Sequence, residues 1–229
     1  MLDFNPKPRF ETRGFLERKR ECDSSWLILQ AESLCRFAKE NGSCTALVYA
    51  ALETRNAIEQ LFFELIYLCR PAGGLTRKDK EECKKKGGVF RVFARFVPDY
   101  QKRVQFTKSC LSLEGSAPHV IAWDTKKLEK YFGKLSQFCH FQGISSETTE
   151  SDFHVWLAKG IALLDEVSGY FESEMSGANS GVLCSETMQP EVRATWEAFR
   201  DGKIDLPSLE TRLRIMQPVM QQRHSFKTG

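Results

Sequence analysis

The chain has 229 residues, 41% of them hydrophobic and 28% charged, with a formal net charge of +3, which is typical of an ordinary globular protein. No run approaches about 18 uninterrupted apolar residues, and the N-terminus has no apolar signal segment, so we expect no membrane span and a cytoplasmic location. Abundant phenylalanine with modest glycine and proline favours packed helices over a β-sandwich, and the eight cysteines, without a C-x-x-C pair, are expected to be buried thiols.

Residues 1–23 are predicted to form a polar arm, because two early prolines oppose a helix there. A first helix is expected to begin at a cap formed by Ser24 or Ser25 and to end at Asn41, where Gly42 follows. Its apolar side is expected to consist of Trp26, Leu27, Leu29, Leu34 and Phe37.

Residues 44–70 contain two stripes at heptad spacing, which predicts a long central helix covered by other helices. The first stripe comprises Leu47, Ala51, Thr54, Ile58, Leu61, Leu65 and Leu68, and the second Val48, Leu52, Arg55, Glu59, Phe62, Ile66 and Cys69. The charged residues Arg55 and Glu59 interrupt the second stripe. Together with Asn56 they are interpreted either as a polar site or as a structural ion pair that sets the helix register.

Residues 77–108 hold eleven Lys or Arg against four acids, a net charge of +7, so that the rest of the chain carries −4. Such asymmetry indicates an anionic partner. A phenylalanine stripe in this segment is expected to hold Arg91 and Arg95 outward on the opposite side of a helix. The expected nucleic-acid-binding residues are Arg91, Arg95, Lys102 and Arg103. The alternative is a solvated helix surface, because the stretch KDKEECKKK mixes both signs.

The second half of the chain also predicts helices. Asp124 or the residue after it is expected to cap one helix, and residues 152–175 form another in apolar register. Residues 24–176 are therefore predicted to be an all-α, up-and-down helical bundle. Residues 177–188 are interpreted as a linker, and residues 189–229 as a short C-terminal helical hairpin and tail.

Two segments resemble the HEPN (higher eukaryote and prokaryote nucleotide-binding) superfamily. ETRNAIEQLFFELI is similar to the second core helix of these domains, and YFGKLSQFCH is similar to a later helix that ends in a histidine. The resemblance covers roughly residues 24–175. It implies an up-and-down helical bundle, often dimeric, and active members are metal-independent ribonucleases of toxin–antitoxin and antiviral defence systems.

The site of that family is an arginine followed after four to six residues by a histidine. Here His140 has Lys134 six positions before it, and the resemblance makes these two the candidate catalytic residues. Arg55 and Asn56 provide the Arg-polar start, but no histidine follows at the expected spacing. Lysine lacks the planar fork of arginine, and His140 could instead cap a helix C-terminus, so the sequence leaves open whether the protein is an enzyme.

Three classes of function remain open. The first is an RNA-binding or RNA-cleaving HEPN-like protein. The second is a non-catalytic helical interaction module that forms a homodimer through Phe62, Phe63 and Ile66. The third, a small-molecule enzyme with a site in the bundle core, is less favoured because no Glu-x-x-His or cofactor motif exists. No cofactor or metal is predicted, since the adjacent Cys139 and His140 would point about 100° apart on a helix.

Overall fold

The computed structural model describes residues 23–69, 75–113, 119–139, 149–175, 181–184 and 188–225, with side chains as far as Gln217. These residues form nine α-helices and no strand, which confirms the predicted all-α fold. The helices are α1 (Ser24–Asn41), α2 (Cys44–Cys69), α3 (Arg77–Cys83), α4 (Gly88–Phe96), α5 (Tyr100–Ser112), α6 (Thr125–Leu135), α7 (Glu150–Met175), α8 (Pro190–Arg200) and α9 (Leu206–Ser225). Within these ranges, no helix has both the length and the hydropathy that crossing a membrane requires.

The described helices pack into two compact units, each discontinuous in sequence. The first comprises the chain up to Glu64 and residues 123–174, and therefore contains α1, most of α2, α6 and α7. The second comprises residues 65–122 and the chain from Met175, and contains α3, α4, α5, α8 and α9. This division differs from the 24–176 grouping expected from sequence, because α5 packs against α8 and α9.

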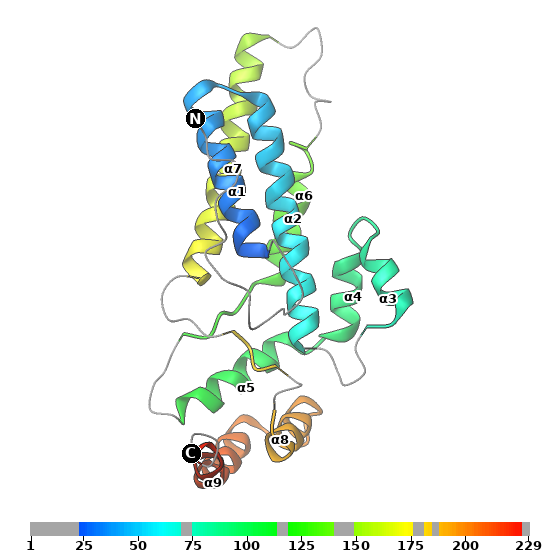
Figure 1. Cartoon of the computed structure of the whole chain (residues 1–229), viewed down its shortest axis with the longest axis vertical. Helices are drawn as coiled ribbons and strands as arrows, with labels where there is room; N and C mark the ends of the chain where they lie inside the picture. The colour runs from blue at the N-terminus through cyan, green and yellow to red at the C-terminus, as the bar shows by residue number, and fades with distance from the viewer. Residues whose placement is uncertain are drawn as a thin grey trace. The chain divides into compact units, whose positions relative to one another are not determined.

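In the first unit four helices lie side by side (Figure 1). Lys39 of α1 forms an ion pair of 2.7 Å with Asp165 of α7. Tyr131 of α6 donates a hydrogen bond of 2.7 Å to Glu166 of α7. At Gly160, α7 approaches α2 so closely that an added Cβ would lie 2.6 Å from a methyl carbon of Leu47. Each helix of the bundle is therefore fixed by side-chain contacts with a neighbour.

The start and the buried side of α1 differ from expectation. Asp23, and not Ser24 or Ser25, caps the helix, since its carboxylate accepts a hydrogen bond of 2.9 Å from the N–H of Trp26. The predicted apolar residues Trp26, Leu29, Leu34 and Phe37 are only half-buried. The buried hydrophobic residues are Leu27, Ile28, Ala31, Cys35 and Ala38. Several of these side chains are small, which allows the helix to approach its neighbours closely.

The first predicted stripe of α2 is buried except for Leu68, which is half-buried. In the second stripe Leu52 is exposed, whereas Phe62 and Ile66 are fully buried. Phe62 and Ile66 were expected to supply a dimer surface. Because other parts of the same chain cover both side chains, they cannot present that surface.

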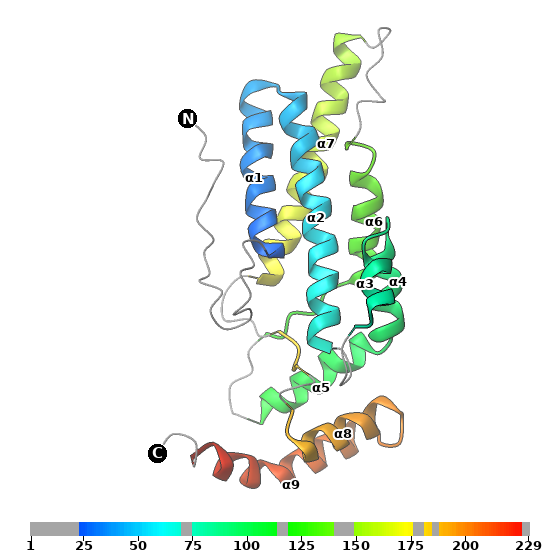
Figure 2. The ribbon, with the colours of Figure 1, turned by 45° about the vertical axis from the view of Figure 1, so that its right-hand side comes forward.

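The second unit contains the predicted C-terminal helical hairpin, formed by α8 and α9 (Figure 2). Phe106 of α5 packs edge-on against Trp196 of α8, with ring centroids 5.3 Å apart. Leu209 and Leu213 of α9 belong to the same buried cluster. Gly202 has a φ of 72° between the two helices, a conformation that glycine adopts without strain.

Candidate nucleic-acid interface

The α3–α4 hairpin, defined here as residues 76–96, is a pair of short helices whose geometry is set locally. Thr76 caps α3: its hydroxyl accepts a hydrogen bond of 3.2 Å from the N–H of Asp79, whose carboxylate accepts one of 3.0 Å from the N–H of Thr76. This capping box fixes the start of α3. At Gly88, an added Cβ would lie 1.8 Å from the carbonyl oxygen of Glu82, so the close turn between the helices requires glycine.

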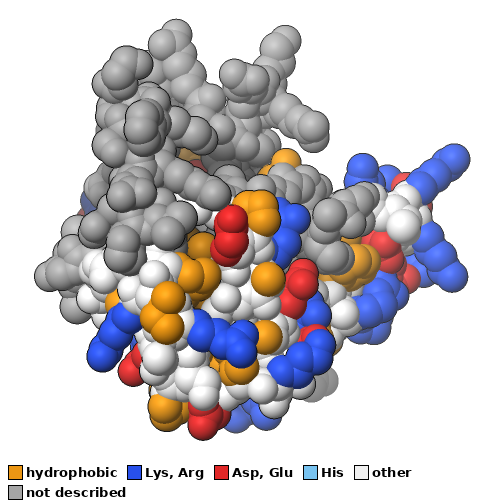
Figure 3. Space-filling model, turned by 90° about the horizontal axis from the view of Figure 1, so that it is seen from below, with side chains coloured by type: hydrophobic (Ala, Val, Ile, Leu, Met, Phe, Trp, Pro, Cys, Tyr) orange, Lys and Arg blue, Asp and Glu red, His pale blue; other side chains and the backbone are white. Residues whose placement is uncertain are grey.

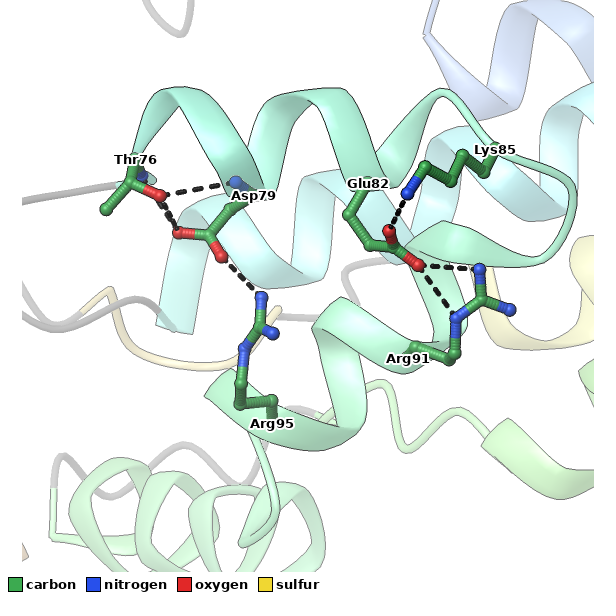
Figure 4. Close-up of polar contacts among 6 residues, drawn as sticks. All are labelled: Thr76, Asp79, Glu82, Lys85, Arg91 and Arg95. Carbon is green, nitrogen blue, oxygen red and sulfur yellow. Dashed lines mark hydrogen bonds and ion pairs between the residues drawn. The ribbon is translucent and has the colours of Figure 1, made fainter.

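Two carboxylates of α3 point toward α4 and hold its arginines (Figure 4). Asp79 forms an ion pair with Arg95. Glu82 accepts hydrogen bonds from Nε and Nη2 of Arg91, at 2.9 and 2.6 Å, on one carboxylate oxygen. Its other oxygen accepts a bond of 2.7 Å from the ammonium group of Lys85. The hairpin is therefore joined across both of its ends by ion pairs.

These contacts alter the acidity of both carboxylates. The hydrogen bond from Lys85, followed by that from Arg91, lowers the pKa of Glu82 to about 2. The hydroxyl hydrogen bond of Thr76 is the largest cause that lowers the pKa of Asp79, and Arg95 acts in the same direction. Both side chains are thus carboxylates at neutral pH, and each neutralises charge on α4.

The opposite side of α3 carries cations. Arg77, Lys80 and Lys84 are exposed and have the i, i+3, i+7 spacing of a single helix face. Among the exposed cations of the hairpin, Arg77, Lys78, Lys80 and Lys86 form no ion pair with another described residue. Lys84 is paired with Glu81 at 2.8 Å. Because two of the three acids of the hairpin are directed toward α4, its outward face stays positive.

The charge of the hairpin is concentrated in a short segment. Residues 76–96 contain eight Lys or Arg and three acids, a net charge of +5. Figure 3 shows Lys and Arg side chains gathered over this element at the right-hand edge of the view. A row of exposed cations along one side of a helix can neutralise successive phosphates of a nucleic-acid backbone.

The four residues expected to bind nucleic acid occupy different environments. Arg91 and Arg95 are exposed but form the ion pairs described above. Lys102 is exposed and donates a hydrogen bond of 2.7 Å to the carbonyl oxygen of Arg200, at the end of α8. These three lie in the second unit, but only Arg91 and Arg95 belong to the hairpin.

Arg103 is buried and therefore does not belong to the interface. Its guanidinium lies 4.5 Å from the centre of the Trp196 ring and donates a hydrogen bond of 2.9 Å to the carbonyl oxygen of Leu183. Burial is the main cause that lowers its pKa. Arg103 thus joins α5 to α8 and to residues 181–184, and its expected role as a phosphate ligand is replaced by a structural one.

The polar residues that interrupt the second apolar stripe of α2 lie in the first unit. Arg55, Asn56 and Glu59 are all half-buried. The guanidinium of Arg55 lies 4.3 Å from the centre of the Phe132 ring on α6, an arrangement that favours a cation. Its Nε atom is buried and has no hydrogen-bond partner among the described residues. Arg55 therefore contributes to packing between α2 and α6.

Of the two candidate catalytic residues, only Lys134 lies within the described ranges. Lys134 is exposed in the last turn of α6, on the same side as the exposed Lys126 and Lys130, at four-residue steps. His140 lies outside the described ranges. Within those ranges, no group of three or more His, Cys, Asp or Glu residues is placed to hold a metal ion.

Sequence reasoning did not single out Arg77, Lys80 and Lys84. It favoured the α4 arginines because the mixed signs of residues 78–86 suggested ordinary solvation. The signal was present in the spacing: the cations recur at three- and four-residue steps, and Asp79 and Glu82 lie on another side of the helix.

Comparisons of the chain with protein-family models, with curated proteins and with solved structures find no match in any of the three.

Proposed function

We propose that this protein binds RNA through the outward face of the α3–α4 hairpin. The observation that supports the proposal most directly is the separation of charge within the hairpin. Asp79 and Glu82 neutralise the arginines of α4, and Arg77, Lys80 and Lys84 line the exposed side of α3. The resemblance of the chain to HEPN domains makes RNA the first polyanion to test.

The expected binding is independent of base sequence and sensitive to salt. Each phosphate neutralised by Lys or Arg releases condensed counterions, which contributes about −0.7 to the slope of log affinity against log salt on single strands. Three contacts, from Arg77, Lys80 and Lys84, whose exposed ion pair with Glu81 the phosphate would displace, therefore predict a slope of about −2. The bases make no required contact in this arrangement.

The test is fluorescence anisotropy with a labelled oligouridine, measured from about 50 to about 300 mM salt. The triple variant Arg77→Glu, Lys80→Glu, Lys84→Glu should lose the salt-dependent binding and keep its helix content. The control variant Lys126→Glu, Lys130→Glu, Lys159→Glu makes the same change in net charge on α6 and α7, at exposed lysines that have no proposed role. Binding that does not depend on salt, or that both variants weaken equally, would argue against the hairpin as the interface.

RNA cleavage is a separate proposal that rests on the HEPN resemblance. It assigns proton transfer to His140, whose ordinary pKa lies near neutrality, and stabilisation of negative charge to Lys134. An effector of a toxin–antitoxin or antiviral defence system would need this activity in addition to binding. The same oligonucleotide, recovered after incubation and separated by size, reports whether cleavage occurs.

A second candidate function is a homodimeric interaction module. Tyr49 and Leu52 lie three residues apart on α2 and are 55% and 39% exposed, so this part of α2 offers apolar surface to a second copy. Light scattering at high micromolar concentration tests the proposal. The proposal is supported if the wild type is a dimer, if Tyr49→Lys with Leu52→Lys dissociates that dimer, and if Val155→Lys on α7 leaves it intact. A monomeric wild type refutes the proposal.

A further inference from the structure

We propose that Arg91 and Lys85 form a phosphate-binding pair that the carboxylate of Glu82 occupies in the free protein. The inference rests on the proposed RNA binding and adds a second contact point to it, at the turn of the hairpin. Glu82 then acts as an internal competitor, and a backbone phosphate of the RNA displaces it.

The geometry around Glu82 is that of an oxyanion site. Arg91 directs Nε and Nη2 at one oxygen, at 2.9 and 2.6 Å, and Lys85 directs its ammonium group at the other, at 2.7 Å. A guanidinium fork beside an ammonium group binds two oxygens of a phosphate equally well. The carboxylate of Glu82 therefore stands in the place of two phosphate oxygens.

The site is open to solvent. The side chains of Arg91 and Lys85 are 59% and 67% exposed, and that of Glu82 is 25% exposed. Ion pairs at such exposure contribute little to stability, so exchanging one anion for another has a small cost. Both cations are therefore exposed enough for a phosphate in solution to contact them.

The other ion pair of the hairpin, between Asp79 and Arg95, has a less exposed carboxylate. The side chain of Asp79 is 10% exposed, and it also accepts hydrogen bonds from the N–H and the hydroxyl of Thr76, at 3.0 and 2.6 Å. Displacing Asp79 from Arg95 would expose a carboxylate that also caps α3. The structure therefore favours displacement of the Glu82 carboxylate by a phosphate, whereas the ion pair between Asp79 and Arg95 is retained.

Displacement of the Glu82 carboxylate by a phosphate has a measurable consequence for RNA affinity. In the wild type, a phosphate must compete with a tethered carboxylate for Arg91 and Lys85. A neutral side chain at position 82 removes the competitor and makes both cations available to the same RNA. Affinity should then rise beyond the gain from the change in net charge, while the salt slope should stay close to that of the wild type, because the same phosphate contacts form in both complexes.

The experiment compares Glu82→Gln with Glu197→Gln in the oligouridine binding assay. Glu197 is exposed on α8 and forms no ion pair with a described residue, so its substitution changes the net charge equally. We expect Glu82→Gln to tighten binding by about tenfold at low salt, with a similar slope, and Glu197→Gln to tighten it by less than about twofold. Adding Arg91→Gln to Glu82→Gln should remove the gain.

Two further results keep this inference separate from the proposed function. If the wild type shows salt-dependent binding that the Arg77, Lys80 and Lys84 reversal abolishes, but Glu82→Gln and Glu197→Gln behave alike, the inference is overturned and the proposed function stands. If Glu82→Gln lowers the helix content, Lys85→Gln with Arg91→Gln replaces it. That variant should weaken binding and flatten the salt slope, and unchanged binding would overturn the inference.

Discussion

Glu64 on α2 accepts two hydrogen bonds from Ser24 in the first turn of α1, one from the N–H at 3.0 Å and one from the hydroxyl at 2.7 Å. Gln60 donates a third, at 2.9 Å. The carboxylate therefore satisfies donors at the start of α1 that the helix itself leaves unpaired. Glu64→Ala should lower the free energy of unfolding by about 2 kcal/mol, measured by urea titration.

The same carboxylate predicts a pH dependence. Burial is the main cause that raises the pKa of Glu64 above its usual 4.5, against the hydrogen bonds from Ser24 and Gln60. A raised folded-state pKa means that the stabilisation is complete below the unfolded-state pKa and decreases as pH rises through the folded-state pKa. The difference in unfolding free energy between wild type and Glu64→Ala should therefore be larger at about pH 4 than at about pH 8. A difference that grows with pH would contradict the burial of this group.

Gly88→Ala should disrupt the hairpin, because the new Cβ would meet the backbone oxygen of Glu82 at 1.8 Å and neither backbone can yield easily. Overpacking of this kind costs about 1–3 kcal/mol or more. Hydrogen exchange of the α3 and α4 amides is the suitable measurement, and exchange should accelerate there. Gly133→Ala on α6 is the control, since its Cβ would meet no atom within 4 Å, and it should stabilise α6 by about 0.5–1 kcal/mol.

Arg103→Ala should destabilise the second unit without changing RNA binding. The substitution removes the contact with the Trp196 ring and the hydrogen bond to Leu183, which together contribute about 2 kcal/mol. Urea unfolding followed by tryptophan fluorescence measures the loss. A reduced salt slope of RNA binding in this variant would indicate that Arg103 contacts RNA, against this prediction.

His140→Ala should leave RNA binding unchanged and, where the wild type cleaves RNA, abolish the cleavage. The imidazole would move a proton during attack of the 2′-hydroxyl, whereas binding depends on the hairpin cations. Incubation of oligonucleotide with each protein in the presence of a chelator, followed by gel separation, gives the measurement. Cleavage that persists in His140→Ala, or that the chelator stops, would contradict the HEPN-derived assignment.

Local sequence signals were sufficient for the starts of α3 and α6, although not for the cap and the buried side of α1. Thr76 and Asp124 accept hydrogen bonds from N–H groups three residues ahead, so the caps of α3 and α6 depend only on neighbours in the chain. The heptad spacing of residues 47–65 likewise predicted a buried face of α2, because helical periodicity follows directly from residue order. Composition and periodicity therefore determined the all-α fold.

Only the tertiary structure decided which cations remain available to bind an anion. Arg103 and Lys102 are neighbours in sequence, yet Arg103 is buried beside Trp196 and Lys102 is exposed, through contacts with residues 80 to 98 positions away. Arg91 is paired with Glu82 because the turn at Gly88 brings α4 back onto α3. Burial and ion pairing depend on which distant helices pack together, and no local spacing contains that information. The spacing of α3 already contains its row of cations, whereas the neutralisation of Arg91 and Arg95 could be seen only once α4 was found to pack against α3.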